Sequence, residues 1–157
     1  MADFNSYESL FAAIQVAVND TLGDEVAETA VEVLETEEQN TVYGAYNNPD
    51  MQYKRRLADG GLLDRSNISA HLISDGVLQI QNNTPVNEEY NLGNNDMSLA
   101  EMIVEGTGYD YPLNGNRDYP YAQPRDFIGA TEDDLVKTGA HIDAMKRGLR
   151  NRGFEVK

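Results

Sequence analysis

The sequence predicts an α+β protein, in which a long N-terminal amphipathic helix and a C-terminal helix pack on a small antiparallel β-sheet with long extended loops. Apolar residues recur at helical spacing near both ends, and a β-branched stretch with a hairpin turn lies between them. A Tyr-, Pro- and Gly-rich stretch precedes the last helix. A chain of 157 residues has room for one ordinary domain, so we expect a single domain over residues 1–157.

Residues 1–41 are predicted to form an acidic helical segment. Apolar residues recur every three to four positions from Phe4 to Leu22, which predicts a helix over about residues 5–21. Gly23 interrupts this pattern, and Asp24 is predicted to cap a second helical run. The shared apolar face of that second run consists of Val26, Ala30, Val33 and Leu34.

Residues 42–130 are predicted to contain a β-hairpin, a short helix and a long Tyr/Pro loop. Asp75-Gly76 is a strong signal for a two-residue hairpin turn. Ser98 followed by Glu101 is a capping-box pattern that opens the short helix, and Gly106 can end it. Long loops inside a domain usually serve binding or assembly, so we expect that role for the Tyr/Pro loop.

Residues 131–153 are predicted to form the C-terminal helix. Thr131 is expected to cap its start and Gly153 to stop it. Its apolar face is formed by Leu135, Ile142, Met145 and Leu149.

Charge is distributed unevenly along the chain, whose formal net charge is −15. Residues 1–53 hold eleven acids and no base, whereas residues 135–157 hold six bases and two acids. This balance disfavours binding to DNA phosphates or anionic lipid. The acidic and basic segments could pair within one subunit or between neighbours, or remain two solvated helix faces. Glu25, Glu28, Glu32 and Glu35 form an acidic ridge whose self-repulsion a cation would relieve.

The sequence contains no pattern typical of a catalytic, cofactor or metal site. The chain has no Cys, and its histidines, His71 and His141, have no partner at the spacing of a zinc pair. A phosphate-binding loop and a nucleophile elbow are both missing. No export signal or transmembrane segment is visible. We therefore expect a protein that is not an enzyme and uses neither cofactor nor metal, with no membrane partner.

Residues 43–153 resemble the small tail-completion, or neck, proteins of tailed bacteriophages. The resemblance depends on an ordered set of motifs: Tyr53-Lys54-Arg55-Arg56 leading into Gly60–Asp64, the hairpin, Leu99–Gly106, Pro124–Ile128, and a final helix ending in Gly148–Gly153. Where this chain has Arg125-Asp126-Phe127, the family usually has Arg-Pro-Phe.

The resemblance implies a structural virion protein that forms a homo-oligomeric ring, a hexamer or dodecamer, between head connector and tail. Its implied neighbours are head-completion or connector proteins and tail-terminator or tail-tube proteins. It would be made in the host bacterial cytoplasm and act in the virion, where DNA passes through without specific binding.

Three sets of residues are candidates for roles in such a ring. Interfaces are enriched in Tyr and Arg, so contacts to a neighbouring subunit or ring are expected from Tyr109, Tyr111, Tyr119, Tyr121, Arg125 and Phe127. Basic residues proposed between subunits are Arg55, Arg56, Arg147 and Arg150. Acidic residues proposed to face the channel, where they would repel DNA phosphates, are Glu28, Glu32 and Glu35.

Two other readings of the sequence remain open. In the first, the acidic run from Asp24 to Glu38 imitates DNA phosphates and the protein inhibits a nucleic-acid-binding enzyme. The second is a metal-dependent hydrolase, which the sequence supports less because no ligand spacing is present. A mimic acts as a monomer or dimer, so the mass in solution distinguishes it from a ring protein.

Overall fold

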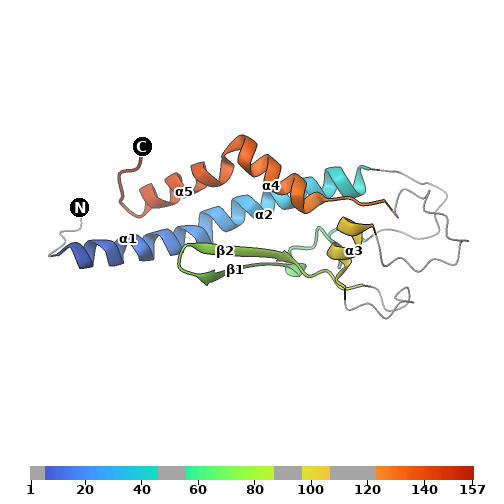
Figure 1. Cartoon of the computed structure of the whole chain (residues 1–157), viewed down its shortest axis with the longest axis horizontal. Coiled ribbons are helices and arrows are strands. Elements are labelled where there is room, and N and C mark those ends of the chain that lie inside the picture. Colours follow the sequence, from blue (N-terminus) through green and yellow to red (C-terminus); the bar gives the residue numbers. More distant parts are fainter. Residues whose placement is uncertain (1–5, 46–55, 87–96, 107–122) are drawn as a thin grey trace, which may run out of the picture. The chain divides into compact units, whose positions relative to one another are not determined.

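The computed structural model describes residues 6–45, 56–86, 97–106 and 123–157, which form helices and a two-stranded antiparallel sheet (Figure 1). The predicted α+β class is therefore confirmed. The chain divides into two compact units. Unit 1 comprises Met1–Val33, Ala70–Ile80 and Asp134–Lys157, and unit 2 comprises Leu34–Ser69 and Gln81–Asp133.

The N-terminal segment is helical throughout its described length. It consists of α1 (Tyr7–Thr21), the π-helical turn η1 (Leu22–Val26), α2 (Ala27–Glu37) and a second π-helical segment, η2 (Glu38–Tyr43). Ser6 and Ser9 form a reciprocal capping box at its start. The predicted helix interruption at Gly23 and helix cap at Asp24 are wrong. Both residues lie inside η1, and the chain stays helical on either side of it.

One face of this helical segment is buried at every fourth residue. Val26, Ala30, Leu34, Glu38 and Val42 are each at most 8% exposed. In a regular α-helix, a residue lies about 40° further around the helix axis than the residue four positions before it. The wider turn of η2 offsets this drift between Glu38 and Val42. The same pattern therefore places a glutamate, Glu38, in line with apolar residues.

The hairpin consists of β1 (Ile68–Ser74) and β2 (Val77–Asn82), preceded by the short 3-10 helix η3 (Arg65–Asn67). Its two-residue turn is Asp75-Gly76, as predicted, and Gly76 adopts φ +75°. Within unit 1, Asn19 of α1 contacts this turn. Its Nδ2 donates to Asp75 Oδ1 at 3.0 Å, and its Oδ1 accepts from Gly76 N at 3.0 Å.

Helix α3 (Leu99–Glu105) begins and ends as predicted. Ser98 Oγ accepts from Glu101 N at 3.2 Å, the Glu101 carboxylate accepts from Ser98 N at 2.7 Å, and Gly106 ends the helix at φ +64°. The buried apolar side chains of unit 2 are Leu34, Val42, Leu62, Ala100, Met102, Ile103 and Phe127.

The predicted C-terminal helix is two helices, α4 (Phe127–Thr138) and α5 (Ala140–Asn151). They are separated at Gly139, whose φ of +69° breaks the helical geometry. The start at Thr131 is also wrong. Asp126 caps α4 by accepting from Gly129 N at 2.7 Å, and Thr131 lies inside the helix, donating to the Phe127 carbonyl.

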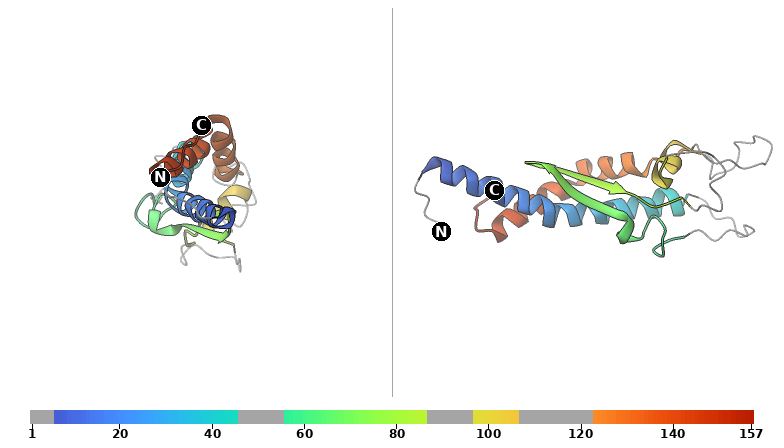
Figure 2. Two further views of the ribbon diagram at one scale, coloured as in Figure 1. Left: turned by 90° about the vertical axis from the view of Figure 1, so that its left-hand side faces the viewer. Right: turned by 90° about the horizontal axis from the view of Figure 1, so that it is seen from below.

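Helix α5 runs alongside α1 in both Figure 1 and Figure 2, and antiparallel to it. Small side chains form the core of unit 1: Ala17, Thr21, Val26, Ala27, Ala30 and Ala144 are buried there. Gly153, at φ +87°, follows the end of α5 as expected. Within the described residues, no helix is long and apolar enough to cross a membrane.

Candidate functional site: an acidic groove on the long helix

We call the continuous helical segment from Tyr7 to Tyr43 the long helix. An open groove of about 450 Å³ lies between the long helix and α5 in unit 1. Its lining residues are Asp24, Glu25, Glu28, Thr29, Glu32 and Arg147. Four carboxyl groups therefore follow one side, and a single guanidinium lies on the other. We call this feature the acidic groove.

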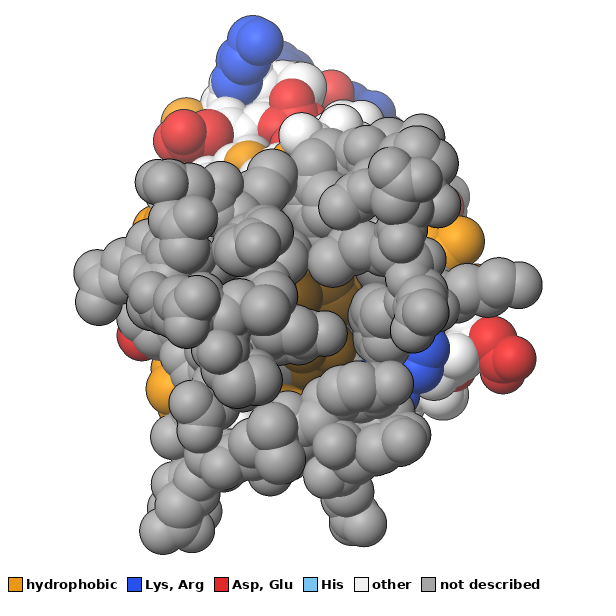
Figure 3. Space-filling view, turned by 90° about the vertical axis from the view of Figure 1, so that its right-hand side faces the viewer, with side chains coloured by type: hydrophobic (Ala, Val, Ile, Leu, Met, Phe, Trp, Pro, Cys, Tyr) orange, Lys and Arg blue, Asp and Glu red, His pale blue; other side chains and the backbone are white. Residues whose placement is uncertain are grey.

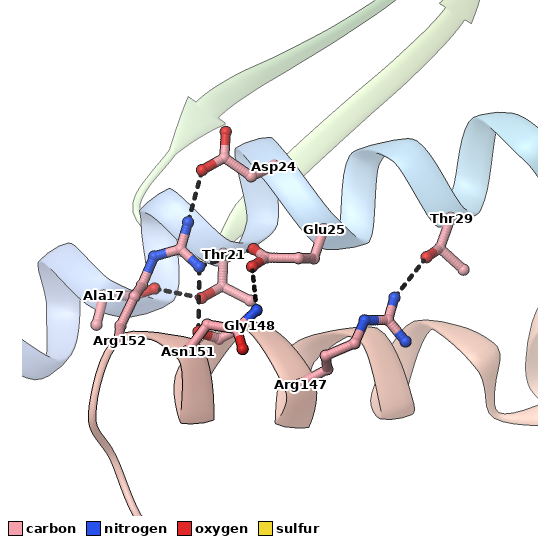
Figure 4. Close-up of polar contacts among 9 residues, drawn as sticks. All are labelled: Ala17, Thr21, Asp24, Glu25, Thr29, Arg147, Gly148, Asn151 and Arg152. Carbon is pink, nitrogen blue, oxygen red and sulfur yellow. Dashed lines mark hydrogen bonds and ion pairs between the residues drawn. The ribbon is translucent and has the colours of Figure 1, made fainter.

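Arg152, just after α5, closes one end of the acidic groove (Figure 4). Its Nη2 lies 2.5 Å from Asp24 Oδ2, and its Nη1 lies 2.7 Å from Glu25 Oε2. The same Nη1 donates to the Gly148 carbonyl at 3.1 Å, and Asn151 Nδ2 donates to Glu25 Oε1 at 3.2 Å. Here the acidic and basic ends of the chain pair within one subunit.

These contacts change the titration of the ion pair. Burial raises the pKa of Glu25, but hydrogen bonds from Arg152 and Asn151 and the positive charge of Arg152 outweigh it, so the pKa lies below its usual value. The hydrogen bond to Glu25 raises the pKa of Arg152. Both groups are thus charged over the whole physiological range.

Gly148 allows α5 to approach the long helix closely enough for these contacts. A Cβ at this position would collide with Thr21 Cγ2 and would lie 2.6 Å from Glu25 Oε2. Thr21 is fully buried, and its hydroxyl donates to the Ala17 carbonyl at 2.7 Å, so its side chain has little freedom to move. A side chain on residue 148 would therefore push the two helices apart.

The predicted acidic ridge is divided by ion pairs. Glu28 and Glu32 line the acidic groove with exposed side chains. In unit 2, Arg65 binds Glu35 through two parallel bonds, Nε to Oε1 and Nη2 to Oε2, each of 2.9 Å. Elsewhere on the surface, acidic and basic side chains also lie near one another, as at the upper edge of the view in Figure 3. Arginines of the chain itself, Arg65 and Arg152, therefore provide positive charge that relieves the repulsion among these acids.

Two predicted inter-subunit arginines contact their own subunit in unit 1. Arg147 lines the acidic groove and its Nη2 donates to Thr29 Oγ1 at 3.5 Å. Arg150 donates from Nε and Nη2 to the Val156 carbonyl, at 3.2 and 2.9 Å. Both side chains remain exposed, so these contacts leave part of each guanidinium at the surface.

The other predicted contact residues belong to unit 2 or lie outside the described residues. Arg56 donates to the Pro85 carbonyl at 2.9 Å. Arg125 is 7% exposed and Phe127 is 0% exposed, so both pack inside the subunit instead of presenting a surface to a neighbour. Outside the described residues lie Arg55, Tyr109, Tyr111, Tyr119 and Tyr121.

A buried glutamate in unit 2 was not singled out from the sequence. Glu38 is 0% exposed, and Asn82 Nδ2 donates to its Oε1 at 2.6 Å and to the Leu62 carbonyl at 3.0 Å. Its Oε2 has no hydrogen-bond partner among the described residues. Burial raises the pKa of Glu38 to about 8, aided by the charge of Glu35 and opposed by the Asn82 hydrogen bond.

Thr84 fixes the orientation of the asparagine that contacts Glu38. The Asn82 Oδ1 accepts from Thr84 Oγ1 at 2.5 Å and from Thr84 N at 3.0 Å, which leaves Nδ2 directed at the glutamate. The signal for this network was present in the sequence. Glu38 continues the four-residue spacing of Val26, Ala30 and Leu34, where an apolar residue is expected.

The acidic groove provides carboxylates for ionic contacts. Among residues 6–45, 56–86, 97–106 and 123–157, no three His, Cys, Asp or Glu side chains are grouped so as to hold a metal ion. The exposed Glu28 and Glu32 can attract cationic groups and repel phosphates.

Comparison with known proteins identifies one family. The YomN family model matches residues 6–151, which is nearly the whole chain. YomN is a phage-type protein of the Bacillus phage SPbeta region, which indicates phage origin. No curated protein and no solved structure matches the chain.

Proposed function

The chain belongs to the YomN family, and from this phage-type membership we propose that it is a structural, non-enzymatic subunit of the phage neck. It forms a homo-oligomeric ring between the head connector and the tail, and DNA passes through the ring. Its neighbours are connector or head-completion proteins on one side and tail-terminator or tail-tube proteins on the other.

The observation that carries this proposal is the exposed apolar surface at the start of the long helix. Tyr7 is 80% exposed and Phe11 is 67% exposed, one helical turn apart on α1. Large aromatic side chains are typical of the buried centres of protein interfaces. A subunit that assembles with other proteins has a use for such a surface, whereas an inhibitor that acts through acidic charge alone does not require it.

The acidic groove supports the passage of DNA. Carboxylates that face a channel repel phosphates, so DNA moves through without adhering. We assign this role to Glu28 and Glu32, which are exposed. Glu35 is held by Arg65 in a two-bond ion pair, so it contributes less repulsion than the sequence suggested.

The rival function, DNA mimicry, is less well supported by the pattern of ion pairs. A mimic presents a continuous row of charges to a basic groove on its target. Here Arg152 contacts Asp24 and Glu25, and Arg65 contacts Glu35, so the row is interrupted within the chain itself. Among the described acids of this run, Asp24, Glu28 and Glu32 are exposed, and Asp24 is already bound by Arg152.

The first experiment measures the mass of the purified protein by light scattering, alone and with the candidate connector and tail proteins. We expect a discrete ring, alone or after addition. A stable monomer that ignores the virion proteins but is captured by a basic nucleic-acid enzyme would replace the neck function with mimicry.

A second experiment tests the acidic groove in virions. Reversing charge with Glu28→Lys and Glu32→Lys is expected to slow DNA exit, because phosphates would adhere to the new cations. The control, Glu132→Lys with Asp133→Lys, also reverses two charges, at exposed sites on α4. DNA release at the wild-type rate in the double variant would refute the channel role, while ring formation would be judged separately.

A further inference from the structure

Two Asp-Gly dipeptides occur in the sequence, Asp59-Gly60 and Asp75-Gly76. An aspartate followed by glycine is prone to spontaneous isomerisation, because glycine has no side chain to shield its backbone nitrogen. Both aspartates are exposed to solvent. Both glycines have positive φ angles, of +70° and +75°, so the two dipeptides share a sequence, an exposed aspartate and a left-handed glycine. Differences in their reactivity must therefore come from their surroundings.

The reaction begins when the glycine nitrogen attacks the aspartate Cγ. A bond forms between the nitrogen and Cγ, and the carboxyl OH leaves with the proton of the nitrogen as water, which produces a five-membered succinimide. Water then adds back to either carbonyl of this ring. Addition at Cγ restores aspartate, whereas addition at the backbone carbonyl leaves isoaspartate, in which the chain runs through the side-chain carbon. The extra backbone atom would distort a tight turn.

In unit 1, Asn19 holds both reacting groups of Asp75-Gly76, and the hairpin turn lies beside α1 (Figure 1). Gly76 N donates to Asn19 Oδ1 at 3.0 Å, and Asn19 Nδ2 donates to Asp75 Oδ1 at 3.0 Å. Gln15 Nε2 also donates to Asn19 Oδ1, at 3.2 Å, which helps to hold the Asn19 amide in place. Attack on Cγ requires the Gly76 nitrogen to lose its proton and turn toward the side chain, so the contact with Asn19 must break first.

In unit 2, Asp64 holds one of the two reacting groups of Asp59-Gly60. Gly60 N donates to Asp64 Oδ2 at 2.8 Å. Asp64 is itself held by Ser66, whose N and Oγ donate to Asp64 Oδ1 at 3.0 and 2.7 Å. The Asp59 carboxylate has no hydrogen-bond partner among the described residues. The glycine nitrogen is therefore held at both dipeptides, whereas the carboxylate is held only at Asp75.

We propose that Asp59-Gly60 and Asp75-Gly76 are sites of isoaspartate formation, and that Asp64 and Asn19 slow the reaction at each by holding the glycine N–H. Breaking one hydrogen bond before attack should slow the reaction by roughly 2- to 10-fold. Asp75-Gly76 is held by two such bonds, so it is slowed more than Asp59-Gly60. This inference does not depend on the neck function, and its failure would leave that function untouched.

The wild-type protein provides the first test. It is incubated in warm, near-neutral buffer with and without denaturing urea, digested with trypsin and analysed by mass spectrometry. Trypsin cleaves after Arg65, so Asp59 and Asp75 lie on different peptides, and fragmentation locates each isoaspartate within its peptide. Relative to the unfolded protein, we expect folding to slow isoaspartate formation at both positions, and more at 75 than at 59. Equal rates in folded and unfolded protein, or a smaller effect of folding at 75 than at 59, would overturn the proposal.

Two variants then test the two holding residues against each other. Asn19→Ala should raise the rate at position 75 by at least about twofold and leave position 59 unchanged, and Asp64→Ala should do the reverse. Alanine is favourable in a helix, so Asn19→Ala should preserve α1. A general loosening of the fold would instead raise both positions together. An equal rise at both positions in a variant that circular dichroism shows to be folded, or no rise at the released position, would overturn the proposal. The wild-type comparison needs no variant, so it decides the matter even where a variant fails to fold.

Discussion

Glu38 makes the stability of the protein depend on pH in an unusual direction. Its carboxyl is fully buried, and its pKa of about 8 means that the folded protein holds this proton far more tightly than the unfolded chain does. The contribution of Glu38 to stability is therefore greatest below its unfolded pKa. It falls as the pH rises and is fully lost above about pH 8.

The size of the effect follows from the two pKa values. The usual value is 4.5 and the folded value is about 8, and each pH unit between them corresponds to about 1.4 kcal/mol. Ionisation of Glu38 should thus cost the folded state on the order of 5 kcal/mol. The ion pair of Glu25 does not obscure this loss, because a lowered pKa acts only in more acidic solution.

Glu38→Gln is the variant that tests this, since an amide is neutral at every pH. We expect urea unfolding to show wild-type stability falling by several kcal/mol between about pH 5 and about pH 8.5, with the glutamine variant nearly constant. The two proteins should be similar at the lower pH, where each has a neutral side chain whose oxygen can accept from Asn82 Nδ2. Glu32→Gln, an exposed site on the same helix, should retain the wild-type pH dependence.

A clear result would refute this reasoning. The difference in unfolding free energy between wild type and Glu38→Gln could prove to be the same at both pH values. In that case the pKa of Glu38 is the same in the folded and unfolded states. The buried network would then be structural only.

Two further predictions concern the contact between α5 and the long helix. Gly148→Ala should destabilise by about 1–3 kcal/mol because its methyl collides with Thr21, whereas Gly23→Ala, where nothing lies within 4 Å, should stabilise by about 0.5–1 kcal/mol. Thermal unfolding of both variants checks this, and a stabilised Gly148→Ala would contradict the close approach. Arg152→Gln should lower the melting temperature and raise the pKa of Glu25 measured by NMR; an unchanged Glu25 titration would contradict the ion pair.

Local signals explain why parts of the fold could be predicted. The hairpin turn at Asp75-Gly76 and the capping box from Ser98 to Glu101 depend on residues within a few positions of each other, so the sequence contains the whole interaction. The helix start at Thr131 failed because Thr131 and Asp126 are both cap formers, and only tertiary packing of Phe127 decides between them.

The contacts of the candidate site were harder to predict because they join distant residues. Arg152 meets Glu25 across 127 positions, and the sequence indicated only that acidic and basic segments could pair. Glu38 ends the acidic run that begins at Asp24, so its charge alone indicates a solvated position. Its burial depends on tertiary packing around Asn82, which lies 44 positions further along the chain, so no local sequence pattern indicates it.

The π-helical turn η1 also bears on how the gene can vary in length. A π-turn contains one residue more than an α-helical turn, so removing one residue from Leu22–Val26 can convert it into a regular α-helical turn. Thr21 before the turn and Ala30 after it, which are both buried in unit 1, would then keep nearly the same relative orientation around the helix axis. A single deletion should therefore be tolerated better within η1 than within α2, where it would turn every later residue by about 100°.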